Sequence, residues 1–317
     1  MQDHANVHRV VLAWRSWALL DLTGKEHAVT LLRQSVRFCC DEEGSIQKRG
    51  DEPLRSLLPR LLEKAGSGRQ SNRDSQPNDA WVERLSQTIY ASTPEQAAEA
   101  AALALAEGIS PETIGEAISM AANQLVLHDP GRRREDTAAK PKGSVHGASV
   151  GVHASDSANA WRNIARVSNR RNTLASMIVG AYHTAGQSRG LNPNAYPFAE
   201  HREKIRSVAD DALLPEAEAA IKASDQARAC ALVHRYGELG RQARPVFDML
   251  LRYAISEDGA LHAEKYYRTV TEEFAATRPA FRWRHLAALA RVSASEYGHP
   301  APGMAEASRL LASSSKA

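Results

Sequence analysis

The sequence contains few cysteines and few aromatic residues. Its 317 residues include three cysteines, and phenylalanine, tryptophan and tyrosine together make up 6%. Three cysteines without a CxxC spacing exclude a disulfide framework and a zinc site built from cysteine pairs. We therefore expect a protein of the reducing cytoplasm.

Long hydrophobic runs are also absent. A membrane helix needs about 18 consecutive apolar residues, and the candidates here, such as Ala97–Ala106, are shorter and rich in alanine. The first residues carry charges before a short, interrupted apolar stretch, which is not the pattern of a signal peptide. No Walker loop, no strand-associated GxGxxG and no GxSxG motif occurs. We expect no membrane partner and none of the chemistry that these motifs carry.

Neither sign of charge predominates, with 40 Lys and Arg residues against 37 Asp and Glu residues. The basic runs Arg132–Arg134 and Arg170–Arg171 are short, whereas a nucleic-acid interface typically shows a sustained basic stripe with interleaved aromatics. We therefore expect no nucleic-acid partner.

What the sequence does contain is helical periodicity. Strands would need strict alternation of apolar and polar residues, and almost no stretch shows it. Apolar spacings of three and four residues predict an all-α, multi-helix fold of about ten or more helices built from helical hairpins. The predicted helices are Val7–Leu22, Glu26–Phe38, Leu54–Leu62, Ala98–Glu107, Ile114–Val126, Ser155–Ser168, Arg171–Thr184, Glu200–Ser207, Pro215–Ala223, Gln226–Leu239, Arg244–Ser256, Leu261–Thr277 and Arg282–Tyr297. For the helix that runs through Ala98–Glu107 we predict a start with Thr93 as N-cap and Pro94 at the first helical position.

Composition also suggests a domain organisation. Gly66–Asn78 contains no large apolar residue and is typical of a surface linker. We expect an N-terminal helical hairpin region at 1–64, a flexible linker at 65–78, a main all-α domain at 79–304 and a frayed tail at 305–317.

The twelve histidines are the main functional clue. Three of them follow a valine, in Val7-His8, Val152-His153 and Val233-His234. Each precedes a further histidine on the next predicted helix, namely His27, His183 and His262. In helical hairpins such pairs can converge on one interior, where imidazole can bind a metal or transfer protons near neutral pH.

The segment Gly143–Arg162 combines glycines with polar residues. We predict an ordered glycine-rich loop to Gly151 that carries His146, preceded by a mobile basic arch at Arg132–Lys142. In the helix that follows, His153, Asp156 and Asn159 share one face, which makes them candidate catalytic residues. An alternative interpretation is a helix cap, in which Ser155 or Asp156 caps the helix and Asn159 faces solvent.

Short patches of the chain resemble a known family. Val7-His8, Ala13-Trp14 and Gly24–Ala28, with the later Val152-His153, Asn159-Ala160 and Trp161, resemble the helical, histidine-bearing domains of questin oxidase-like proteins and related helical domains fused to Rieske iron–sulfur modules. The resemblance implies an all-α enzyme that oxidises a small hydrophobic or aromatic molecule. No cysteine and histidine pairing for a Rieske cluster is present, so the electron donor would be a separate protein.

Three functions are compatible with these features. The first is a helical, oxygen-using oxidoreductase with iron or another divalent transition metal; its candidate ligands are His27, His146, His153, His183 and His262, with Asp156 as carboxylate partner. The second is a non-catalytic helical ligand-binding or scaffold protein. The third is a metal-free acid–base enzyme that uses His153 and Asp156.

Overall fold

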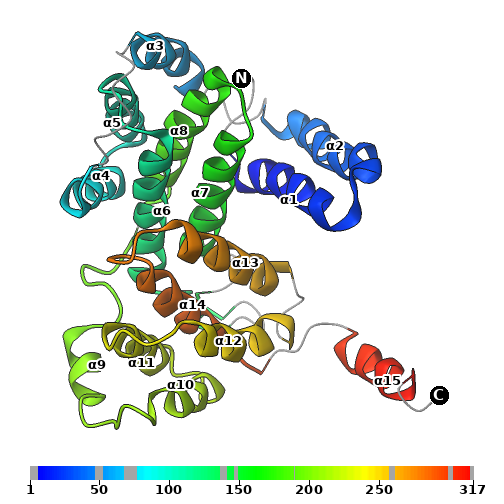
Figure 1. The fold of residues 1–317 in the computed structure, drawn as a ribbon, viewed down its shortest axis with the longest axis vertical. Helices are drawn as coiled ribbons and strands as arrows, with labels where there is room; N and C mark the ends of the chain where they lie inside the picture. Colours follow the sequence, from blue (N-terminus) through cyan, green and yellow to red (C-terminus); the bar gives the residue numbers. More distant parts are fainter. Residues whose placement is uncertain are drawn as a thin grey trace. The chain divides into compact units, whose positions relative to one another are not determined.

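The computed structural model describes residues 6–46, 53–67, 77–135, 141–145, 149–188, 190–256, 261–298 and 303–314. Within these ranges the chain forms fifteen α-helices, one 3-10 turn and no strand, which confirms the predicted all-α fold (Figure 1). None of the described helices has both the length and the hydrophobicity that crossing a bilayer requires.

The chain divides into two compact units, neither of which is continuous in sequence. The first comprises Met1–Leu125 with His153–Arg189, and the second comprises Val126–Val152 with Gly190–Ala317. The first unit holds α1 (Val7–Thr23), η1 (Lys25–His27), α2 (Ala28–Ile46), α3 (Leu54–Gly66), α4 (Asp79–Ala91), α5 (Pro94–Ala106), α8 (Arg170–Ala185) and most of α6 (Pro111–Leu127) and α7 (Val150–Arg166). The second holds α9 (Ala199–Lys204), α10 (Leu213–Lys222), α11 (Gln226–Glu238), α12 (Arg244–Ser256), α13 (Leu261–Ala276), α14 (Trp283–Glu296) and α15 (Met304–Ser314).

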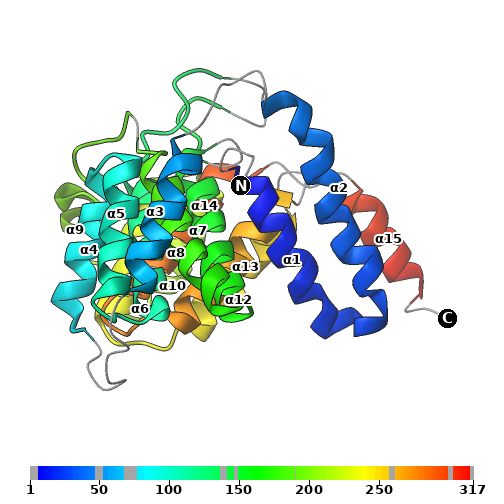
Figure 2. The same cartoon turned by 90° about the horizontal axis from the view of Figure 1, so that it is seen from above.

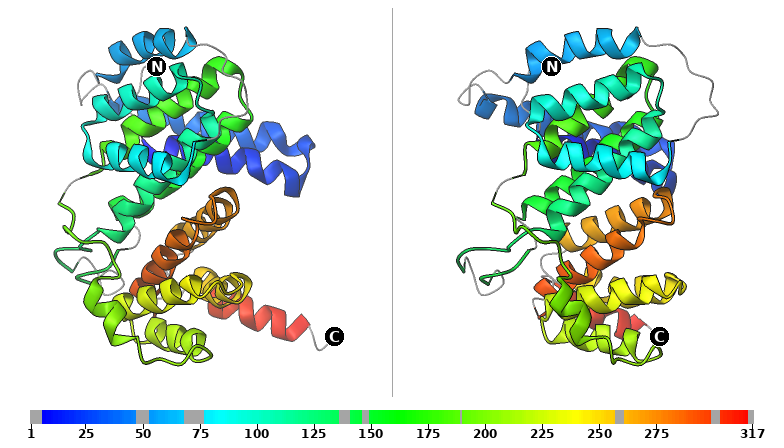
Figure 3. Two further views of the ribbon diagram at one scale, coloured as in Figure 1. Left: turned by 60° about the vertical axis from the view of Figure 1, so that its left-hand side comes forward. Right: turned by 90° about the vertical axis from the view of Figure 1, so that its left-hand side faces the viewer.

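The first unit contains helical hairpins, as the sequence predicts. Helices α1 and α2 lie side by side, joined by η1, and the Ser16 and Ser35 hydroxyls lie 3.0 Å apart between them (Figure 2). Helix α5 packs against both α3 and α8 (Figure 3). Its predicted start is confirmed, because the Thr93 side chain accepts from the Gln96 amide and the Gln96 side chain accepts from the Thr93 amide in a capping box.

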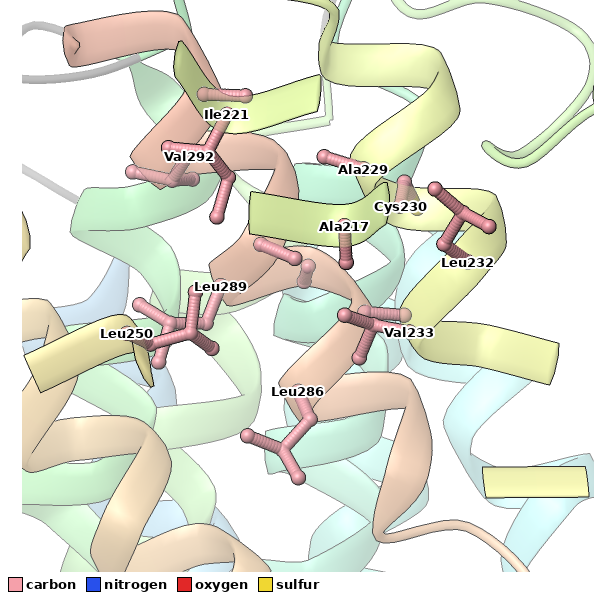
Figure 4. Packing of buried hydrophobic residues seen from close by; sticks show 14 of the residues in the cluster. Ala217, Ile221, Ala229, Cys230, Leu232, Val233, Leu250, Leu286, Leu289 and Val292 are labelled. Atoms are coloured by element: carbon pink, nitrogen blue, oxygen red, sulfur yellow. The ribbon is translucent and has the colours of Figure 1, made fainter. Parts of the chain in front are cut away.

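The second unit has an apolar core centred on α11 and α14. Leu232 and Val233 of α11 and Leu286 and Leu289 of α14 are each at most 2% exposed and belong to one continuous cluster (Figure 4). Gly237 of α11 lies directly against the Trp283 ring, so the absence of a side chain there allows the two helices to approach closely.

Several predicted boundaries differ from the observed ones. Helix α4 was not among the predicted helices, and α7 begins at Val150, five residues before the predicted start at Ser155. Residues 304–314 form α15, where the sequence suggests a frayed tail. Of the expected linker at 65–78, residues 68–76 lie outside the described residues.

The segment between α6 and α7 is partly ordered by backbone hydrogen bonds. The Arg132 amide donates to the Ser144 carbonyl, and the Gly143 amide donates to the Arg132 carbonyl, both at 2.9 Å. Val145 is fully buried, whereas Val150, the first residue of α7, is 40% exposed. Residues 136–140 and 146–148, which include His146, lie outside the described residues.

Candidate functional site

Helices α1 and α7 pack against each other through a small apolar cluster. Val10 and Val11 of α1 and Ala160 of α7 form its buried part, and Trp14 and Trp161 pack against it. Both helices carry the same motif elements in the same order, with a Val-His pair near the start and an Ala-Trp-Arg triplet further on. The two similar segments that the sequence singles out are therefore neighbours in the fold.

The first histidines of the two helices lie together. The His8 and His153 ring centroids are 5.4 Å apart with an interplanar angle of 76°, and each ring offers a nitrogen within 4.8 Å of the other. Asn6 caps α1 by accepting from the His8 amide at 2.9 Å, which fixes His8 in the first turn. Two imidazoles on one zinc ion would have nitrogens at most about 4 Å apart, which is close to the separation limit of 4.8 Å found here.

The remaining predicted residues of α7 form a buried polar face. Asp156 is 1% exposed and Asn159 is 0% exposed, although both side chains are polar. The Asn159 amide oxygen accepts from the guanidinium of Arg15 on α1 at 3.3 Å. The cap interpretation of this segment is wrong, because Ser155 and Asp156 lie inside α7 and Asn159 does not face solvent. The prediction that His153, Asp156 and Asn159 share one face of a helix is compatible with their positions in α7.

A set of charged residues holds α7 against α6. Arg162, 1% exposed, donates to the Glu112 carboxylate at 2.6 and 2.9 Å, and Arg166 donates to the same carboxylate at 2.7 and 2.9 Å. Burial acts to raise the pKa of the Glu112 carboxyl, but the two guanidinium groups outweigh it and the pKa is lowered. Arg166 also donates to the Asn163 side chain, whose amide donates to the Asn159 carbonyl. The polar face of α7 is thus anchored at its C-terminal end.

The other predicted ligands lie on other elements or outside the described residues. His27 is exposed in η1, which follows the C-terminal end of α1, whereas His8 lies in the first turn of that helix. The two residues are therefore about 25 Å apart along the axis of α1. His183 is buried in the last turn of α8; among the described residues no group unites it with both His8 and His153 within 4.8 Å. His262 lies in the first turn of α13, in the second unit, and His146 lies outside the described residues.

Two residues of this site are absent from the ligand and catalytic sets predicted from sequence. His8 is the nearest histidine partner of His153 on α1, and Arg15 is the cation that contacts Asn159. A signal for both was present, since Val7-His8 and Ala13-Trp14-Arg15 repeat the pattern around His153 and Arg162. That repetition indicates helices of similar environment, and in this fold they pack together.

The arrangement offers two kinds of chemistry. A pair of neighbouring imidazoles can bind a divalent transition metal, and a nearby carboxylate can complete or orient the ligand set. Alternatively, an imidazole and a carboxylate on one helix face can act as general base and orienting group. Comparisons give no further guide, since the chain matches no family model and no curated protein or solved structure at a significant level.

Proposed function

We propose that the protein is a metal-dependent helical oxidoreductase in which His8 and His153 bind a divalent transition metal. The observation that carries the proposal is the His8–His153 pair, with ring nitrogens within 4.8 Å of one another. Asp156, buried one helical turn from His153, is the carboxylate partner in this proposal. Imidazole and carboxylate ligands with open positions are the usual platform for iron that activates dioxygen.

The substrate in this proposal is a small hydrophobic or aromatic molecule. The resemblance to questin oxidase-like domains supports this class, as do the two partly buried tryptophans, Trp14 and Trp161, that pack against the apolar cluster between α1 and α7. Arg15 gives the same region a cation, which suits a substrate with a phenolate or carboxylate group. The electron donor would be a separate protein. A cytoplasmic location agrees with the three free cysteines.

The test is metal binding by the full chain purified without a histidine tag. We expect Fe(II), added anaerobically, and Co(II) to bind at about one ion per chain. His8→Ala and His153→Ala should each weaken binding by about tenfold or more, because each removes one ligand. His27→Ala is the matched control, because it removes an exposed histidine from the same hairpin and should bind as the wild type does.

Each result of this titration has a definite meaning. Fewer than about 0.2 ions per chain, unchanged by added Fe(II), would end the metal proposal. Equal affinity in His8→Ala and the wild type would also contradict it. The same titration of His262→Ala and His183→Ala tests whether these two residues, predicted as ligands from sequence, contribute.

A second candidate is metal-free acid–base catalysis by His153 with Asp156. The observation that favours it is the burial of Asp156 at 1% exposure, since a carboxylate in this position can hold an imidazole in one orientation. It predicts that His153→Ala and Asp156→Asn abolish turnover while the metal content stays unchanged. If neither metal binding nor any turnover depends on these residues, the chain is the helical scaffold or ligand-binding protein of the remaining alternative.

A further inference from the structure

The second unit contains a hollow that the proposed function does not use. It has a volume of about 400 Å³ and lies between α9, the turn that follows it, and the C-terminal end of α11. Three arginines line it, namely Arg202, Arg206 and Arg235, together with two glutamates and apolar side chains that include Ile205 and Leu239. A ligand of small-molecule size would fit a hollow of this volume.

The three arginines differ in how far their charge is already neutralised. Arg235 is held by the carbonyls of Ile205 and Arg206, at 2.8 and 2.6 Å, and lies 3.4 Å from Asp210. Arg206 lies 3.4 Å from Glu203, in a pair that is largely exposed. Among the described residues Arg202 forms no ion pair, although its side chain lines the hollow. Arg202 is therefore a cation without a neutralising carboxylate.

The pKa of a neighbouring histidine, His234, is lowered in part by the same positive charges. Burial lowers the pKa of His234 on α11, Glu238 acts in the opposite direction, and the charges of Arg202 and Arg284 lower it further. Glu238 also lines the hollow, and its carboxylate is 3.5 Å from the His234 ring.

We propose that this hollow binds a small organic anion, with its carboxylate or phosphate group on Arg202 and Arg206 and its apolar body against Ile205 and Leu239. Guanidinium groups form charge-assisted, often bidentate hydrogen bonds with these oxyanions. Arg235 is fixed by the carbonyls behind it, so it gives the hollow a positive wall without having to move. The site is independent of His8 and His153, which belong to the first unit.

The test is a titration of the full chain with phenyl phosphate, benzoate and inorganic phosphate, followed by calorimetry and by the imidazole resonances of His234. Phenyl phosphate and benzoate separate the two anion classes, and inorganic phosphate shows what the anion alone contributes. We expect saturable binding of at least one organic anion, tighter than inorganic phosphate. Bound anion should also raise the pKa of His234, because it offsets the charge of Arg202.

Variants assign the binding to the hollow. Arg202→Ala should weaken binding by about five- to tenfold, and Arg206→Ala should weaken it in the same direction. Arg244→Ala is the matched control, since Arg244 is an exposed arginine of α12 in an ion pair with Asp248, and it should bind as the wild type does. Fe(II) binding by Arg202→Ala should be unchanged, which separates this test from that of the metal site.

Two outcomes would overturn the proposal. One is that none of the three anions binds saturably up to about 10 mM, because a functional site should have a Kd at or below that concentration. The other is that Arg202→Ala and Arg244→Ala bind equally well, since binding would then be general attraction to a basic surface.

Discussion

At the scale of single residues, Glu112 shows how a partly exposed carboxylate can stabilise a buried charge. Its side chain is 46% exposed, while Arg162, which it neutralises, is 1% exposed. An exposed ion pair contributes little because water competes for both groups, whereas a buried cation that loses its partner is costly. The stabilisation therefore depends on burial of the arginine.

Glu112→Gln should lower the free energy of unfolding by about 1–2 kcal/mol at pH 7, because the buried guanidinium loses its counter-charge. The matched control is Glu99→Gln, since Glu99 is also 46% exposed but pairs with Arg60, which is 62% exposed. That substitution should cost about 0.5 kcal/mol or less. Denaturant unfolding of the three proteins measures both effects, and equal losses would contradict the argument.

The same residue predicts a dependence on pH. The pKa of Glu112 is lower in the folded chain than in the unfolded chain, so its stabilisation is fully present above the unfolded pKa of about 4.3. It is lost as the pH falls through the folded pKa, where the native carboxylate becomes protonated. The difference in free energy of unfolding between the wild type and Glu112→Gln should therefore stay constant at near-neutral pH, from about pH 6 to about pH 7. It should shrink below about pH 4. A stability difference that grows as the pH falls would have the opposite sign and would contradict the lowered pKa of Glu112.

Cys230 differs from the other two cysteines in burial, and we expect it to differ in reactivity. It is fully buried in α11, and burial raises the pKa of its thiol to about 12, against the opposing charge of Arg291. Because the thiolate is the reactive form, it should be inert at neutral pH. A thiol reagent such as Ellman's reagent should label Cys39 and Cys40 in the native chain and Cys230 only after unfolding. Cys230→Ala should remove the late phase alone, and rapid labelling of all three thiols would contradict the buried position.

At the residue scale, part of the candidate site could be predicted from the sequence. The face of His153, Asp156 and Asn159 could be predicted because it depends only on helical spacing. The partner of His153 could not, since its identity depends on which helix packs against α7. The repeated Val-His motif points to His8, but its place beside His153 depends on the contact of α1 with α7, which local spacing does not encode.

At the scale of elements, helix starts were predictable where capping residues specify them. Thr93 and Pro94 mark the start of α5, and the capping box confirms it. For α7 the start depends on tertiary contacts, because the Ser149 hydroxyl donates to the Asp129 carboxylate at 2.6 Å immediately before the helix. Gly151 disfavours a helix by about 1 kcal/mol relative to alanine, yet this residue is buried inside α7. Packing outweighs local preference there.

The α5 cap gives a prediction at this scale. Thr93→Ala should destabilise the protein by about 1 kcal/mol, because the Gln96 amide loses its acceptor. Thr88→Ala is the control: Thr88 is exposed in α4 and its hydroxyl donates to the Arg84 carbonyl one turn earlier, so its loss should be close to neutral. Thermal unfolding compares the two, and a loss in Thr88→Ala as large as that in Thr93→Ala would contradict the role of the cap.

At the scale of the whole molecule, the fold class followed from composition and periodicity, whereas the division into units did not. Each unit is assembled from two separate stretches of chain, and two of the three divisions fall within α6 and α7. A linker is visible as a change in composition, but a division inside a continuous helix leaves no local signal. Only the pairing of distant helices reveals it.

Metal binding should be visible in the stability of the whole molecule. A ligand that binds only the folded state adds about 2.7 kcal/mol at one hundred times its Kd. We expect Co(II) at that level to raise the Tm of the wild type by several degrees, about 5 °C, and to leave His153→Ala unchanged. An equal rise in both proteins would mean that the metal binds elsewhere.

The central claim is that His8 and His153 are ligands of one metal ion. The most direct measurement is the X-ray absorption spectrum of the chain loaded with one equivalent of Zn(II), with His8→Ala and His153→Ala beside it. The claim predicts at least two imidazole nitrogens at about 2.0–2.1 Å from the metal in the wild type, and one fewer in each variant. A spectrum without imidazole scattering, or one that stays the same in both variants, would contradict it.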